Sequence, residues 1–138
     1  MSGMFAGCIS LKNINLSNFN TRKVKDMSFM FEECLSLKAI CLRNFIADNV
    51  INMEYIFNDC SSLKEIILEN FNTKNVENIK KMFFGCSSLE KLYISNFIIT
   101  NVLNMENIFD EYLLKKFFCN YLINKSAILN LDITKIKK

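Results

Sequence analysis

The chain has 138 residues and a formal net charge of +3; 51% of its residues are hydrophobic and 22% are charged. This length and apolar content suit one packed domain and exclude a disordered tail. No apolar run approaches the roughly 18 to 20 residues that a bilayer-spanning helix needs, which excludes a membrane span. The chain has no histidine, so it lacks the commonest general base and zinc ligand, and most enzyme hypotheses are weakened.

The basic excess lies at the end of the chain. Residues 1–109 hold 11 Lys and Arg against 11 Asp and Glu, so all of the excess falls in residues 110–138. The lysines there are spread along the sequence, whereas a nucleic-acid-binding surface would gather them on one face. We therefore interpret the tail as solvated and expect neither nucleic acid nor a membrane surface as a partner.

A 26-residue period runs through most of the sequence. Internal repetition at this scale is typical of solenoids, propellers and arrays. The recurring positions include the cysteines Cys8, Cys34, Cys60 and Cys86, the phenylalanines Phe5, Phe31, Phe57, Phe83 and Phe109, and the asparagines Asn18, Asn44, Asn70 and Asn96.

Each repeat predicts two short elements. Alternation places Ile40 and Leu42 on one face of the chain, which predicts a short strand. The apolar residues of 50–57 then follow the i, i+3, i+6, i+7 spacing of a short helix or 3₁₀ stretch. An asparagine precedes this second element in three repeats and is a candidate helix N-cap. These three residues are Asn49, Asn75 and Asn101.

One strand and one helical turn per repeat predict parallel coils stacked around a continuous core. We expect an α/β solenoid of about four to five coils, with a parallel sheet on one face and short helical or 3₁₀ turns on the other. It should occupy residues 1–109 in four units, the first incomplete. Residues 110–138 are interpreted as a degenerate repeat or C-terminal cap with a Lys-rich end, in which 128–133 could add a strand. Because the chain starts inside a unit, we expect a fragment of a longer array or a first coil covered by a partner.

The motif Met30-Phe31-x-x-Cys34-x-Ser36-Leu37-x-x-Ile40-x-Leu42-x-Asn44-Phe45 returns as Met82-Phe83-x-x-Cys86-Ser87-Ser88-Leu89. It resembles the lipoprotein-type repeat, about 25 residues long, of the BspA-like leucine-rich-repeat surface proteins, and the resemblance covers about residues 1–109. It implies a leucine-rich-repeat-like stack that works as a binding or adhesion module, at the cell surface or secreted, with no catalytic residues. The location is expected from the resemblance alone, since no secretory leader or anchor is recognisable in the sequence given.

The cysteine column admits three interpretations. Buried free thiols that serve as small hydrophobes are favoured. Disulfides are less favoured, because Cβ atoms of stacked coils stay about 4.8 Å apart, beyond the roughly 3.8 Å of a disulfide. A metal site is least favoured, because the sequence has neither histidine nor a C-x-x-C pair, and no cofactor is expected.

The phenylalanine and methionine columns are interpreted as core, because each recurs in every unit. The asparagine column follows the strand, and alternation points it inward. A buried amide needs partners, so we expect bonds to the backbone of the adjoining turn or coil. The residues concerned are Asn18, Asn44, Asn70 and Asn96.

Function should lie in the residues that do not repeat, on the outward side of the sheet. The middle outward column holds Cys41, Ile67 and Tyr93, flanked by charged residues. An apolar centre with a charged rim is typical of a protein-binding patch, while ordinary sheet-surface residues stay an equal alternative. We therefore predict a non-catalytic module that binds an unidentified protein. The alternative is a structural or self-assembly unit that forms homo-oligomers through its uncapped N-terminal coil. The predicted binding face consists of Arg43, Glu65, Ile67, Glu69, Lys91 and Tyr93.

Overall fold

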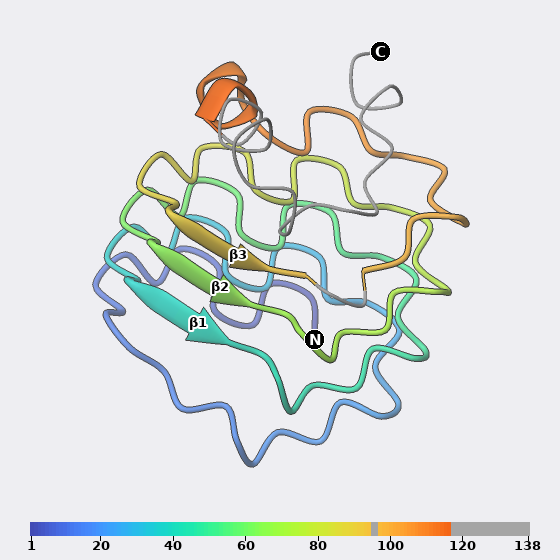
Figure 1. The fold of residues 1–138 in the computed structure, drawn as a ribbon. Helices are drawn as coiled ribbons and strands as arrows, with labels where there is room; N and C mark the ends of the chain where they lie inside the picture. The colour runs from blue at the N-terminus through green and yellow to red at the C-terminus, as the bar shows by residue number, and fades with distance from the viewer. Residues whose placement is uncertain (95–96, 117–138) are drawn as a thin grey trace.

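Three short parallel strands form the sheet of the computed structural model, which describes residues 1–94 and 97–116 (Figure 1). The strands are β1 (Ala39–Cys41), β2 (Glu65–Ile67) and β3 (Lys91–Tyr93), in the order β1-β2-β3. Ile40 pairs with Ile66, and Ile66 pairs with Leu92, so the strand register equals the 26-residue sequence period. This register is what stacked parallel repeats require.

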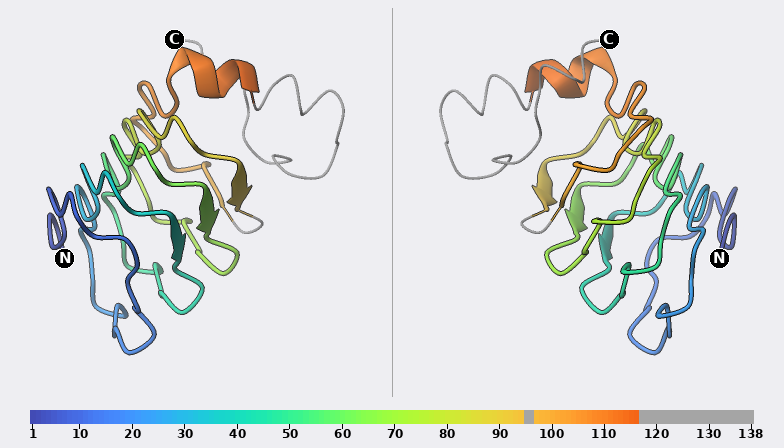
Figure 2. Two further views of the ribbon diagram at one scale, coloured as in Figure 1. Left: turned by 90° about the vertical axis from the view of Figure 1, so that its left-hand side faces the viewer. Right: turned by 90° about the vertical axis from the view of Figure 1, so that its right-hand side faces the viewer.

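The chain returns beside itself after each repeat, so that successive turns of the chain are stacked along one direction (Figure 2). The first turn, in blue, lies at one end of the stack, and the helical segment 111–116, in orange, lies at the other. This arrangement is compatible with the expected solenoid-like repeat. The expected number of coils stays a prediction.

The interior is filled by side chains from equivalent positions of the repeats. Phenylalanine rings form a continuous column in which neighbouring centroids lie 5.3 to 5.9 Å apart and the rings are nearly parallel. Ile40 and Ile66 are buried, whereas their counterpart Ile14 in the first repeat is only partly buried. Each middle repeat is covered on both sides, and this two-sided cover accounts for the difference.

The segments predicted to be short helices are not helical, so that prediction was wrong. Each contains residues with positive φ, such as Tyr55 at 57° and Asp59 at 57°. A left-handed residue cannot continue a right-handed helix. The N–H groups bond to the next repeat instead, as from Phe31 N to Ile56 O at 3.0 Å. The i, i+3 spacing therefore marks a series of tight turns whose backbone is shared with neighbouring repeats.

The asparagines expected to cap those helices link neighbouring repeats instead. The side-chain amide of Asn49 donates to the carbonyl of Arg22 at 2.7 Å, and that of Asn75 donates to the carbonyl of Asp48 at 2.6 Å. Asn101 makes the same kind of bond one repeat further on. No helix begins at these positions, so the amides are available to hold the preceding repeat.

The helical segment 111–116 is held against the last repeats by polar contacts. Asp110 caps it, with Oδ1 accepting from the N–H of Leu113 at 2.8 Å and Oδ2 accepting from the N–H of Gly85 at 3.2 Å. Lys116 Nζ donates to the carbonyl of Leu89 at 2.7 Å. The division of the chain after residue 109 stays a prediction, and the expected strand over 128–133 lies outside the described residues. Among the described residues, no helix has the length and apolar character to cross a bilayer.

Candidate functional site

The predicted apolar centre comes together as one row on the outer side of the sheet. Strand pairing places Cys41 beside Ile67 and Ile67 beside Tyr93. The intervening residues of the strands are buried, so alternation turns this row outward. Cys41 and Tyr93 are exposed, Tyr93 by 40%, and Ile67 is partly exposed. The row therefore presents an aliphatic and an aromatic side chain next to each other.

The charged residues of the predicted face form pairs between neighbouring repeats. Nη2 and Nε of Arg43 donate to the same oxygen of Glu69 at 2.8 and 3.2 Å. Nζ of Lys91 lies 3.9 Å from a carboxylate oxygen of Glu65. Exposed ion pairs of this kind contribute about 0 to 1 kcal/mol each, so they align neighbouring repeats with little effect on stability.

The row does not extend into the first repeat. Residues 13–15 occupy the positions equivalent to the strands but are not a strand, and Asn15 stands where Cys41 stands in the next repeat. The Asn15 side chain accepts a hydrogen bond from the N–H of Ser17 at 3.0 Å. Such local side-chain bonds compete with strand pairing. The apolar row thus begins at Cys41.

The cysteine column divides between core and surface. Cys34, Cys60 and Cys86 are buried free thiols, whereas Cys8 and Cys41 are exposed. Each buried thiol donates to a phenylalanine carbonyl of the preceding repeat, as Cys60 does to Phe31 O at 3.0 Å. Burial, with a smaller contribution from the neighbouring thiol, raises the pKa of Cys34 to about 11 and that of Cys60 to about 12. Cys8 departs from the column because it lies in the first repeat, which is covered on one side only.

The asparagine column is exposed, contrary to the prediction that it points inward. Asn18, Asn44 and Asn70 are all exposed, and Asn96 lies outside the described residues. The chain makes a tight turn at each of these positions, as shown by the bond from Phe45 N to Leu42 O at 2.9 Å. This turn ends the strand alternation on which the prediction depended. Neighbouring backbone amides bond elsewhere, and the asparagine side chain faces water.

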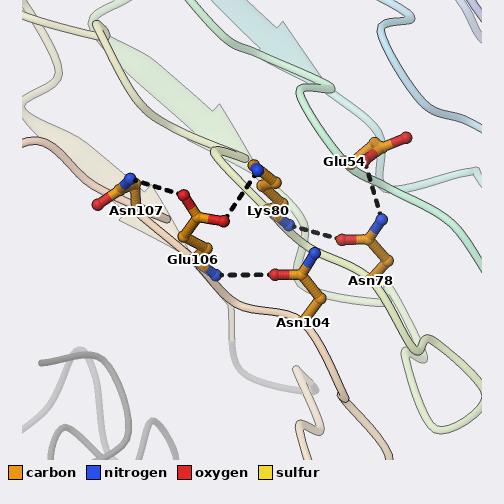
Figure 3. Close-up of polar contacts among 6 residues, drawn as sticks. All are labelled: Glu54, Asn78, Lys80, Asn104, Glu106 and Asn107. Carbon is orange, nitrogen blue, oxygen red and sulfur yellow. Dashed lines mark hydrogen bonds and ion pairs between the residues drawn. The ribbon is translucent and has the colours of Figure 1, made fainter. Parts of the chain in front are cut away.

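Another asparagine column, which sequence reasoning missed, carries the polar links between repeats. Asp26, Asn52, Asn78 and Asn104 bridge in series, each opposite the next. The side-chain oxygen of Asn78 accepts from the N–H of Lys80 at 3.1 Å, and its amide donates to Glu54 at 2.9 Å (Figure 3). The recurrence of Asp or Asn directly before the column of Met27 and its equivalents was the available signal.

The same region contains a paired lysine and glutamate. Nζ of Lys80 lies 2.8 Å from Glu106, and Asn107 donates to the other oxygen of this carboxylate at 3.3 Å (Figure 3). The hydrogen bond to Lys80, followed by its charge, lowers the pKa of Glu106. Both groups are bound to a neighbouring repeat, so this cluster holds the stack together and offers no reactive group.

A third polar cluster lies at the turn around Asn58. Its amide donates to Asp59 at 2.8 Å and to Glu32 at 3.5 Å, while its buried side-chain oxygen has no hydrogen-bond partner. Burial, then the charges of Glu33 and Asp59, raises the pKa of Glu32. Across residues 1–94 and 97–116, no three His, Cys, Asp or Glu side chains are arranged to hold a metal ion.

The comparison with known proteins concerns the repeats as a whole. A family model described as "Mycoplasma protein of unknown function, DUF285" matches residues 1–120, which include every repeat. No curated protein and no solved structure matches the chain. The family match and the 26-residue strand register agree that this is a repeat protein. The chain belongs to the DUF285 family of Mycoplasma proteins.

Proposed function

We propose that the chain is a non-catalytic protein-binding module that acts through the outer face of β1, β2 and β3. The observation that carries the proposal is the outward row of Cys41, Ile67 and Tyr93 in strand register. A partly exposed aromatic ring beside an aliphatic side chain is the kind of anchor that protein interfaces concentrate at their centre. Ion pairs beside the row supply the polar rim.

Adhesion, a location at the cell surface or outside the cell, and a BspA-like relationship belong to the same proposal. The repeat motif and the match to a family of repeat proteins support them. Repeat stacks commonly use an extended face for binding partners. Treatment of intact cells with an impermeant protease tests the location: digestion of the chain supports it, and full protection contradicts it.

The binding test compares the full wild-type chain with Tyr93→Ser and Leu103→Ser. Leu103 is the matched control, because it is 84% exposed and lies outside the sheet. Each form is measured by biolayer interferometry against an array of purified extracellular proteins. We expect saturable binding by wild type and Leu103→Ser, and at least about tenfold weaker binding by Tyr93→Ser, as for a hot-spot residue. Equal binding by all three forms, with unchanged thermal unfolding, would remove this face from consideration.

A second candidate function is self-assembly through the first repeat. Met4 and Ile9 are 48% and 55% exposed, whereas Met30, the counterpart of Met4, is buried. Exposed apolar groups of this kind are often covered in an oligomer. Sedimentation velocity at several concentrations tests this candidate, with Ile9→Lys as the variant that should shift any oligomer to monomer. A monomer at every concentration contradicts it.

A further inference from the structure

The charges that flank the outward row of the sheet are neutralised within the chain. Arg43 directs two donors to one oxygen of Glu69, and Lys91 lies beside Glu65. A partner's carboxylate or ammonium would therefore have to compete with a counter-charge already in place. It would also lose water on approaching the row, and that loss would go uncompensated. Electrostatics at this face thus disfavours charged partners of either sign.

The row itself favours apolar contact. Cys41 and Ile67 offer no strong hydrogen-bonding group, and Tyr93 offers a single hydroxyl on a large apolar ring. Two of the three side chains of the row are exposed and the third is partly exposed. A partner side chain that covers the row therefore gains mainly through the removal of apolar surface from water.

We infer that the segment bound by this face is an uncharged stretch of polypeptide bearing aliphatic or aromatic side chains. The inference rests on the proposed function and names the class of partner for the same site. The contact is centred on Ile67 and Tyr93, with the ion pairs of Arg43 and Lys91 on either side. Binding is nearly independent of salt, because no charge is matched across the interface.

The experiment selects peptides from a random phage-displayed library on the immobilised full chain, in parallel with Tyr93→Ser and Leu103→Ser. Peptides that depend on the face are those retained by wild type and Leu103→Ser but lost on Tyr93→Ser. We expect these peptides to be depleted in Asp, Glu, Lys and Arg relative to the starting library. Their affinity should change less than about twofold between low and high salt, as expected without matched charges.

A face-dependent set enriched in acidic or basic residues would overturn the inference while leaving the proposed function in place. The absence of any peptide that depends on Tyr93 would instead count against the proposed function itself. Glu69→Gln supplies a further control, because it removes the carboxylate that Arg43 holds. Selection on this variant should shift toward acidic peptides, and an unchanged set would refute the role given to the internal pairing.

Discussion

Replacement of Phe57 by alanine tests whether the stacked interior holds the fold together. Phe57 is fully buried, and its ring stacks on Phe31 at 5.7 Å and on Phe83 at 5.9 Å between centroids. Removal of a buried phenylalanine side chain costs about 3 to 5 kcal/mol. The two ring pairs, each worth about 0.5 to 1.5 kcal/mol beyond burial, place Phe57 in the upper part of this range. We therefore expect the free energy of unfolding to fall by about 4 to 5 kcal/mol.

Two further variants separate burial from stacking and middle from end. Phe57→Leu keeps most of the apolar volume and loses both ring pairs, so it should cost about 1 to 3 kcal/mol. Phe5→Ala should cost less than Phe57→Ala, because Phe5 is only partly buried and has one neighbour in its column, Phe31, at 5.4 Å. The cost in each variant follows from how much of the ring its neighbours cover.

The assay is urea unfolding followed by far-ultraviolet circular dichroism. At a slope near 2 kcal/mol per molar urea, a loss of 4 kcal/mol lowers the midpoint by about 2 M. The reasoning fails if Phe57→Ala costs less than about 1 kcal/mol, or if Phe5→Ala is as damaging as Phe57→Ala. Either result would mean that the phenylalanine column is not a continuous packed interior.

Three other predictions concern thiols, turns and polar links. Because the raised pKa of buried Cys60 is about 12, stability should be full below the unfolded value near 9 and fall as pH rises toward 12; urea midpoints across this range should decline less in Cys60→Ala, and a flat profile in wild type would contradict the burial. Gly85→Ala should destabilise the chain more than Gly7→Ala in thermal unfolding, since both have positive φ but only a Cβ at Gly85 would meet the Asp59 side chain and lie 3.0 Å from its Cα; equal effects would argue against the close contact. Asn78→Ala should cost about 1 to 2 kcal/mol by loss of two hydrogen bonds, while exposed Asn70→Ala should stay within about 0.5 kcal/mol, and the opposite order in urea unfolding would show that the asparagine columns are misassigned.

Much of the candidate site followed from the period alone. The outward row of Cys41, Ile67 and Tyr93 could be predicted because parallel strands in register bring equivalent positions side by side. The exposure of Asn44 could not, because it depends on a turn that breaks the alternation directly after the strand. The exposure of Cys8 also escaped prediction, since the column shows equivalence between repeats and says nothing of how many neighbours cover each one.

The sequence by itself determined which residues stack on one another, because a constant repeat length forces equivalent side chains into columns. The tertiary structure alone decided the backbone between strands. Tyr55 and Lys81 adopt positive φ although nothing local favours it. Their N–H groups donate to carbonyls of the next repeat, at 2.8 and 2.9 Å. Partners 25 residues away in sequence hold these turns, and helix propensity, which measures local preference, cannot register such distant hydrogen bonds.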